Sequence, residues 1–192
     1  MKKTLQALVI LLMAIAFISC QKESTQPYQV STGPQILPPP DGGRAGGGTG
    51  TCPDKIVSLV AGQTINSGSV NVTNDSEFIY VTYTTTNGWT LTQTHLYVGA
   101  CALIPVNGPG NPMPGQFPYS TTHANITSYT YQIPISALSM GTCGCIAAHA
   151  VVVQLDQNGN VIQTQTGWGN GTRINPNGGN WGMKFDYCSC TL

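Results

Sequence analysis

The sequence predicts an all-β domain, an antiparallel β-sandwich or jelly roll with long glycine- and proline-rich loops. From residue 51 onward, apolar residues alternate with polar ones, and no stretch keeps the spacing of an amphipathic helix. The pair Asn87-Gly88 separates two runs rich in β-branched and aromatic residues, and it is a strong hairpin signal because both residues tolerate positive φ. Six to eight short antiparallel strands fit a sandwich.

The expected strands follow one another along the chain. Val70 and Val72 alternate with polar residues before a turn at Asn74-Asp75. Later strands are expected at 78–86, 89–98, 128–133, 146–155, 161–166 and near 183–190. Simple alternation within 89–98 puts one set of side chains on a single face, namely Trp89, Leu91, Gln93, His95 and Tyr97. The run 146–153 is apolar on both faces, which favours a central strand.

Three segments lack a strand pattern and are expected to be loops: 100–122, 136–142 and 167–181. The first is rich in proline, and the last is rich in glycine and asparagine. Loops of such length are uncommon in a compact domain and often carry function.

The chain is unusually poor in charge. Of its 192 residues, 7 are Lys or Arg and 7 are Asp or Glu, so 7 % are charged and the formal net charge is zero. An average soluble protein has roughly 25 % charged residues. The absence of a basic run excludes a nucleic-acid footprint. No cofactor motif occurs, and the 41 % of hydrophobic residues suffices for a core.

The N-terminal part predicts export. Lys2 and Lys3 precede an apolar run at 7–18, which is too short to span a bilayer but suits a secretory signal. Residues 21–50 contain five prolines and seven glycines and read as a flexible tether. The expected organisation is a signal peptide at 1–19, a cysteine and tether at 20–50, and a folded domain at 51–192.

The cysteines of the folded domain predict disulfides, because an exported domain folds in an oxidising compartment. The two Cys-x-Cys pairs could form two cross-links between neighbouring strands, with a third disulfide closing elsewhere. In that arrangement Cys143 and Cys145 face Cys188 and Cys190, and Cys52 pairs with Cys101. The alternative is a four-cysteine metal site, although structural zinc sites more often use longer spacers.

Two sets of titratable residues are candidates for chemistry. His95 and His149 lie in expected strands and could meet across a sheet, where Gln93 or Asp75 would complete a partial metal site. The alternative is a pair of hydrogen-bonded structural histidines. Asp75 and Glu77 could form the carboxylate pair of a hydrolase, or they could simply belong to a turn.

The aromatic residues of the loops are candidates for ligand binding. Trp168 and Trp181 flank the Gly/Asn-rich segment, with Arg173 between them, and Tyr119 of the Pro-rich segment could join them. Indole rings stack on sugars, and Arg and Asn side chains hydrogen-bond to hydroxyls. The alternative is that both tryptophans fill the ends of the sandwich.

The segment Phe17-Ile18-Ser19-Cys20 resembles the lipobox of bacterial lipoproteins. The resemblance implies cleavage before Cys20, a diacylglyceryl group on its thiol and acylation of its new amine, which would anchor the protein in a membrane. Gln21 resembles the second residue of lipoproteins destined for the outer membrane. The string Gln21-Lys22-Glu23 resembles a surface-export signal of Bacteroidota lipoproteins.

Several strings resemble a recurrent secreted bacterial β-domain that has no settled activity. They occupy 94–99, 110–119, 146–152, 167–171 and 180–181. The resemblance implies a fold and an extracytoplasmic location, but no reaction. It also implies acids where this chain has Gln93, Gln165 and Asn170, so a cation site of such relatives would be weakened or lost here.

These observations predict an outer-membrane-anchored, surface-facing lipoprotein that is not an enzyme and has no cofactor. Its β-domain would bind a glycan or a partner protein. The alternatives are a structural component of the envelope or surface layer, and a hydrolase acting through Asp75 or Glu77.

Overall fold

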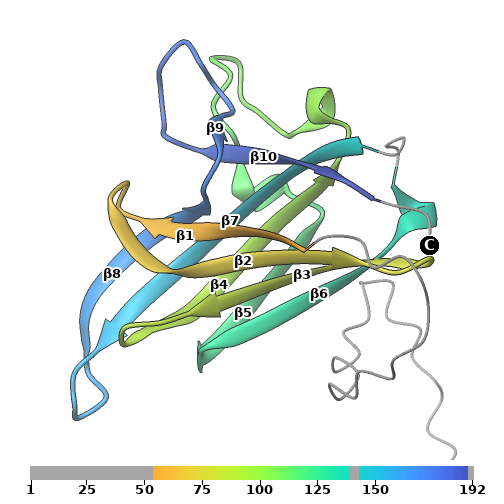
Figure 1. Cartoon of the computed structure of the whole chain (residues 1–192). Helices are drawn as coiled ribbons and strands as arrows, with labels where there is room; N and C mark the ends of the chain where they lie inside the picture. The colour runs from red at the N-terminus through yellow and green to blue at the C-terminus, as the bar shows by residue number, and fades with distance from the viewer. Residues whose placement is uncertain (1–53, 139–142, 190–192) are drawn as a thin grey trace, which may run out of the picture. The chain divides into compact units, whose positions relative to one another are not determined.

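The computed structural model describes residues 54–138 and 143–189, and this region is an all-β antiparallel structure, as predicted. The described residues form ten strands and three single-turn 3₁₀-helices (Figure 1). The strands are β1 Lys55–Ala61, β2 Ile65–Asn74, β3 Phe78–Thr85, β4 Trp89–Gly99, β5 Tyr119–Ile126, β6 Ser128–Pro134, β7 Cys143–Leu155, β8 Val161–Gly169, β9 Thr172–Arg173 and β10 Met183–Cys188. The 3₁₀-helices are η1 Cys101–Leu103, η2 Pro114–Gln116 and η3 Ile135–Ala137.

The strands belong to one sheet, where the sequence predicted two packed sheets. Eight of them follow the order β5-β4-β7-β8-β1-β2-β3-β6, and the sheet coils into a nearly closed barrel (Figure 1). Only Thr127 separates β5 from β6, so the chain passes directly from the β4 edge to the β3 edge. At this seam the hydroxyls of Thr121 and Tyr129 lie 3.1 Å apart. Closure of this kind protects the edge strands of a sheet.

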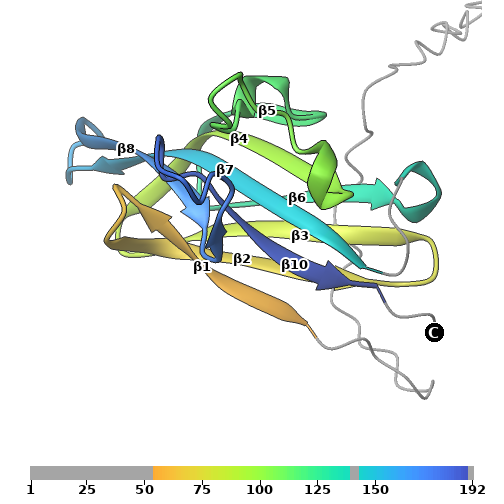
Figure 2. The same ribbon diagram turned by 90° about the horizontal axis from the view of Figure 1, so that it is seen from above.

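Strand β7 is central, as its apolar sequence predicted. It pairs with β4 along one side, while β8 and β10 share the other side. β8 pairs with β7 as far as the contact between Trp168 and His149, and β10 pairs with the N-terminal part of β7 from Ile146 to Cys143. Figure 2 shows β10 running along β7 above β1 and β2.

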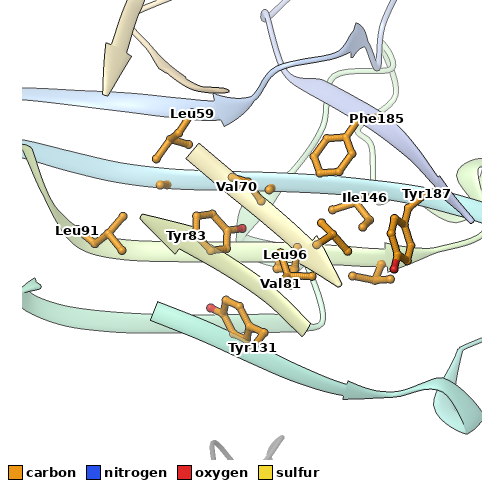
Figure 3. Close-up of a cluster of buried hydrophobic side chains, with 14 of the residues drawn as sticks. Leu59, Val70, Val81, Tyr83, Leu91, Leu96, Tyr131, Ile146, Phe185 and Tyr187 are labelled. Carbon is orange, nitrogen blue, oxygen red and sulfur yellow. The ribbon is translucent and has the colours of Figure 1, made fainter. Parts of the chain in front are cut away.

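The inside of the barrel is a packed hydrophobic core. Figure 3 shows side chains from β1, β2, β3, β4, β6, β7 and β10 converging in it. Tyr83 is fully buried, and its hydroxyl donates a hydrogen bond to the carbonyl oxygen of His95. The Tyr131 hydroxyl, also buried, lies 2.8 Å from the Thr94 hydroxyl. The core therefore satisfies its few polar groups internally, as buried polar groups require.

The hairpin between β3 and β4 is confirmed, but the face assignment within β4 is partly wrong. Asn87 and Gly88 have φ values of 56° and 80°, as the turn requires. A β-bulge between Leu91 and Gln93 then shifts the register. An extra residue reverses the alternation, so Leu91 belongs to the inner core, whereas His95 lies two residues beyond Gln93 on the outer face.

Three strands lie where none was expected. β1 is absent from the prediction, β5 begins inside the segment 100–122, and β9 lies inside the segment 167–181, both of which were expected to be loops. His123 therefore lies in a strand, and its Nε2 is 2.8 Å from the Thr94 hydroxyl. β8 likewise continues beyond its expected end at 166 and includes Trp168.

Two disulfides are present among the described residues, Cys101–Cys145 and Cys143–Cys188. The second is a cross-link between the two Cys-x-Cys pairs, as predicted. The expected Cys52–Cys101 pair is wrong, because Cys101 is bonded to Cys145. These bonds also exclude the four-cysteine metal site. Cys20, Cys52 and Cys190, like the expected signal peptide and tether, lie outside the described residues.

The disulfides indicate an extracytoplasmic location, because cytosolic thiols are normally kept reduced. Within 54–138 and 143–189, no helix has the length and apolar character needed to cross a membrane.

Candidate functional site

Two loops cover the outer surface of β4, β7, β8 and β10, and we call this region the capped face. The loops are residues 100–118 and 170–182, and Figures 1 and 2 show them together over this part of the sheet. Beneath them lies a second, smaller hydrophobic cluster. Its buried members are Tyr97, Ile104, Phe117, Cys145, Ala147 and Trp168, with Ile174, Trp181 and Met183 packed against them.

The capped face forms because the strands carry apolar residues on both sides at this position. After the bulge in β4, Tyr97 points outward, opposite Ala147 of β7. The Cys101–Cys145 disulfide fixes the start of the first loop to β7. The ammonium group of Lys184 lies 3.3 Å from Cys145 Sγ and 3.8 Å from a carboxylate oxygen of Asp186.

Asparagine side chains join the two loops, and we call Asn107, Asn111, Asn175 and Asn180 the asparagine clasp. The Asn175 amide nitrogen donates to the carbonyl of Pro109 at 2.9 Å and to Asn111 Oδ1 at 3.4 Å. The backbone N–H of Asn180 also donates to Asn111 Oδ1, at 2.9 Å. The Asn111 N–H donates to Asn107 Oδ1. The clasp holds the loops together without any charge.

A glycine makes this close contact possible. Gly179 has a φ of 82°, and a Cβ atom there would overlap Asn111 Oδ1. A residue with a side chain would therefore be strained at this position and would displace the amide that joins the loops.

Between the loops lies a groove with a volume of about 330 Å³. We call it the loop groove. It is lined by Cys101, Ala102, Ile104, Val106, Gly108, Pro109, Gly110, Ile174, Asn175, Pro176 and Asn177. None of these residues carries a charge, so the groove presents aliphatic, backbone and amide groups.

The structure brings only some of the predicted ligand-binding residues together. Trp168 is 4 % exposed, and its ring packs 4.8 Å from that of His149 and 6.2 Å from that of Phe117. Trp181 is half-buried against the same cluster, and Arg173 is exposed on β9, opposite Met183.

Tyr119 lies apart from these residues. It packs against the inner core and lines a separate hollow of about 230 Å³ with Tyr97, Pro118 and Leu138. None of Trp168, Trp181, Arg173 and Tyr119 lines the loop groove.

His95 and His149 meet across the sheet, as the strand pattern suggested. They are directly opposite each other on β4 and β7, with ring centroids 5.4 Å apart. The Nδ1 atoms of both rings are buried and lack a hydrogen-bond partner among the described residues. Gln93 lies two residues before His95 on the same strand, whereas Asp75 belongs to the turn before β3. The alternative, a pair of hydrogen-bonded structural histidines, therefore does not account for the two Nδ1 atoms.

Burial favours the neutral form of both histidines. It lowers the pKa of His149 to about 3, with a smaller contribution from charge on His95. It also lowers the pKa of His95, although a hydrogen bond with the Pro114 backbone acts in the opposite direction. Both imidazoles are consequently neutral at pH 7.

Asp75 has a structural role in its turn. Its carboxylate accepts hydrogen bonds from the backbone N–H groups of Glu77 and Phe78 and from the Tyr80 hydroxyl. Burial alone would raise the pKa of Asp75, but these hydrogen bonds outweigh it and lower the pKa. Glu77 lines a hollow with Phe78, Pro134 and neighbouring residues, and no second acid is among the described residues that line it.

Sequence reasoning missed the asparagine clasp and the loop groove. The two Asn-Pro pairs at 111–112 and 175–176 were an available signal, because Asn side chains hydrogen-bond to nearby backbone groups in turns. That signal identifies turns, but it does not reveal which two turns meet.

These features define a disulfide-bonded, extracytoplasmic all-β domain with a capped face. Comparisons with protein-family models, curated proteins and solved structures found no match to this chain.

Proposed function

We propose that this protein is a lipid-anchored envelope protein, not an enzyme, that binds an uncharged extracellular ligand, with a glycan as the favoured class. The observation that carries the proposal is the uncharged loop groove on the capped face. Small-molecule sites are typically concave and combine apolar walls with a few polar groups.

The composition of the groove favours a neutral polar ligand. The amide group of Asn177 and the backbone of Gly108 and Gly110 offer directional hydrogen bonds, while Ile104 and Ile174 offer apolar contact. The amide of Asn175 is already used within the clasp and shapes the wall of the groove. A charged ligand would find no partner of opposite sign in this lining. The volume lies at the small end of the range for ligand sites, roughly 300–1,000 Å³. It suits one or two sugar rings better than a long chain.

A glycan-array screen of the full protein, followed by affinity measurement, tests this function. Gly108 offers a way to block the groove, because nothing lies within 4 Å of a Cβ atom placed there. We expect Gly108→Trp to reduce glycan affinity at least tenfold. Gly115→Trp is the matched control, because Gly115 is equally open but does not line the groove.

The glycan assignment fails if the array shows no ligand, or if Gly108→Trp binds the ligand as well as the unmodified protein does. Trp181→Ala and Arg173→Ala in the same assay show whether these residues extend the site beyond the groove.

A partner protein is the second candidate, and exposed apolar side chains favour it. Leu103 is 64 % exposed, and Val106 of the groove wall is 41 % exposed. Apolar side chains at the rim of a groove are common in protein interfaces. If a protein is the ligand, Leu103→Asp will weaken the complex, and the glycan array will remain blank.

Lipid anchoring at Cys20 is a separate part of the proposal, supported by the lipobox-like sequence. Mass spectrometry of the mature protein should find a diacylglyceryl group and an acylated amine on Cys20. Cys20→Ser should release the protein from the membrane fraction. An unmodified Cys20 in the membrane-bound protein would contradict the anchor.

A further inference from the structure

We propose that His95 and His149 form a binding site for a late transition-metal ion, with Zn²⁺ as the fitting example, held by the Nδ1 atoms of both rings. The site lies on the outer face of β4 and β7, apart from the loop groove, and it is independent of the function proposed above.

The first support is the unpaired state of the two nitrogen atoms. His149 is 8 % exposed, and neither its Nδ1 nor that of His95 has a hydrogen-bond partner among the described residues. A buried polar atom without a partner is costly, typically by about 1–3 kcal/mol. Two such atoms on directly cross-strand residues offer two nitrogen lone pairs to one ion.

The second support is the Pro114 backbone, which acts on the His95 imidazole as a hydrogen-bond acceptor and opposes the lowering of its pKa. Proline has no N–H, so the backbone group that acts on the imidazole is a carbonyl. Nδ1 of His95 has no partner among the described residues, so its lone pair is the one left for a metal. Metal-binding histidines commonly donate one N–H to a carbonyl, which leaves the other nitrogen lone pair for the metal.

The third support is the spacing of the rings. A Zn–N bond is about 2.0–2.1 Å, which places the ion about 3.2 Å from the centroid of each ring if both lone pairs point at it. The observed centroid separation of 5.4 Å is shorter than the sum of two such distances, so both rings can reach a single ion.

The surroundings select the kind of ion. Imidazole nitrogen suits Zn²⁺ and its neighbours, whereas Mg²⁺ and Ca²⁺ require oxygen ligands. Trp168 packs edge-on against His149 and restricts the position of that ring. Gln93 lies two residues before His95 on the same strand, and its amide oxygen is a candidate further ligand. Water would complete the coordination.

The burial that keeps both imidazoles neutral helps binding, because a protonated histidine cannot ligate a metal. Two histidines and water give a modest site, so we expect a dissociation constant on the order of micromolar.

The test is titration of the full, untagged, oxidised protein with Zn²⁺, after treatment with a chelator. We expect one ion to bind per chain and Mg²⁺ to have no effect. His95→Gln and His149→Gln should each weaken Zn²⁺ binding at least tenfold. His123→Gln is the matched control, because His123 is a half-buried histidine of the seam with its own partner, Thr94, and it should bind as the unmodified protein does.

Nitrogen NMR of the unmodified protein gives a readout that does not depend on the folding of a variant. The Nδ1 resonances of His95 and His149 should move on addition of Zn²⁺, while those of His123 stay in place. The proposal is overturned if Zn²⁺ does not bind, if these resonances do not move, or if the His95→Gln and His149→Gln double variant keeps its affinity.

Discussion

Strands β4 and β7 have an inner face and an outer face, and the two faces carry different chemistry. The inner face contributes side chains such as Leu96 and Ile146, which are fully buried in the barrel. The outer face contributes His95, His149 and Cys145, which lie beneath or beside the two loops of the capped face. The first region is held by apolar packing, and the second by a disulfide, amide hydrogen bonds and a small aromatic cluster.

The difference suggests a division of labour. A tightly packed interior loses free energy with every deleted methylene, so it tolerates little change. Loops held to a rigid sheet by a few bonds can change without unfolding it, which is why binding sites commonly occur there. The unpaired imidazole nitrogens and the groove both lie on the outer side.

The largest expected effect comes from removing the disulfides. Cys101–Cys145 and Cys143–Cys188 have nearly equal sequence separations, 44 and 45 residues. On the chain-entropy model each is worth about 4 kcal/mol. We expect the paired alanine variants to lower the free energy of unfolding by similar amounts, measured by urea denaturation under oxidising conditions.

The two disulfide variants should differ on the capped face. Only loss of Cys101–Cys145 should increase hydrogen exchange in residues 101–110 of the folded protein, because of the two disulfides it is the one that joins the first loop to β7. Equal exchange of this loop in the two variants would show that the disulfide does not organise the groove.

The next largest effect is a difference in stability between variants of two neighbouring residues of β4, Leu96 and Tyr97. Leu96→Ala removes a fully buried inner side chain and should cost about 3 kcal/mol of stability. Tyr97→Phe removes only the outer hydrogen bond from its hydroxyl to the Ala100 carbonyl, and it should cost about 1 kcal/mol. Urea denaturation of both variants checks the order. A larger loss for Tyr97→Phe would mean that this outer hydrogen bond stabilises the protein more than the inner packing of Leu96 does.

The histidines predict a pH dependence of stability. The pKa of His149 is about 3 in the folded protein and about 6.5 in the unfolded chain, so below pH 6.5 the unfolded state binds the extra proton. Above pH 6.5 the neutral His149 leaves the free energy of unfolding at its full value. That free energy falls as the pH drops from 6.5 toward 3. At pH 4.5 the loss attributable to His149 should be about 2–3 kcal/mol.

Urea denaturation at pH 7 and pH 4.5, with a chelator present, measures this loss. His149→Gln should show a much smaller difference between the two pH values. An unchanged pH dependence in that variant would assign the acid sensitivity to other groups.

The strands with strong alternation could be predicted from the sequence, whereas the arrangement of the sheet could not. Phe78–Thr85 and Trp89–Gly99 stand out because β-branched and aromatic residues flank an Asn-Gly turn. The bulge at 91–93 has no signal in the alternation itself, so it reversed the face assignment for Leu91. Closure into a barrel depends on long-range pairing of β5 and β6 with β4 and β3, which local patterns do not encode.

The candidate site was predictable only in part. The meeting of His95 and His149 followed from two central strands being neighbours. The disulfide partner of Cys145 did not follow, because Cys101 lies in a 3₁₀ turn that has no strand register. The asparagine clasp joins residues more than 60 positions apart, such as Asn111 and Asn180, and only the folded structure reveals such a contact.

The smallest expected effect on overall stability concerns this clasp. Asn111→Ala removes the acceptor for the Asn180 N–H and for the Asn175 amide, both of which lie in loops outside the barrel. We expect a loss of at most about 1 kcal/mol in global unfolding, because the main core is untouched. Local opening should change more, because a loop held by few bonds opens without global unfolding. The Asn180 amide should therefore exchange at least several-fold faster, as measured by NMR.

Asn111→Asp is the matched control, since its carboxylate keeps both acceptor contacts and should preserve the protection. If Asn111→Ala leaves the Asn180 exchange rate unchanged, the loops are held by the aromatic cluster, and the clasp adds nothing to the capped face.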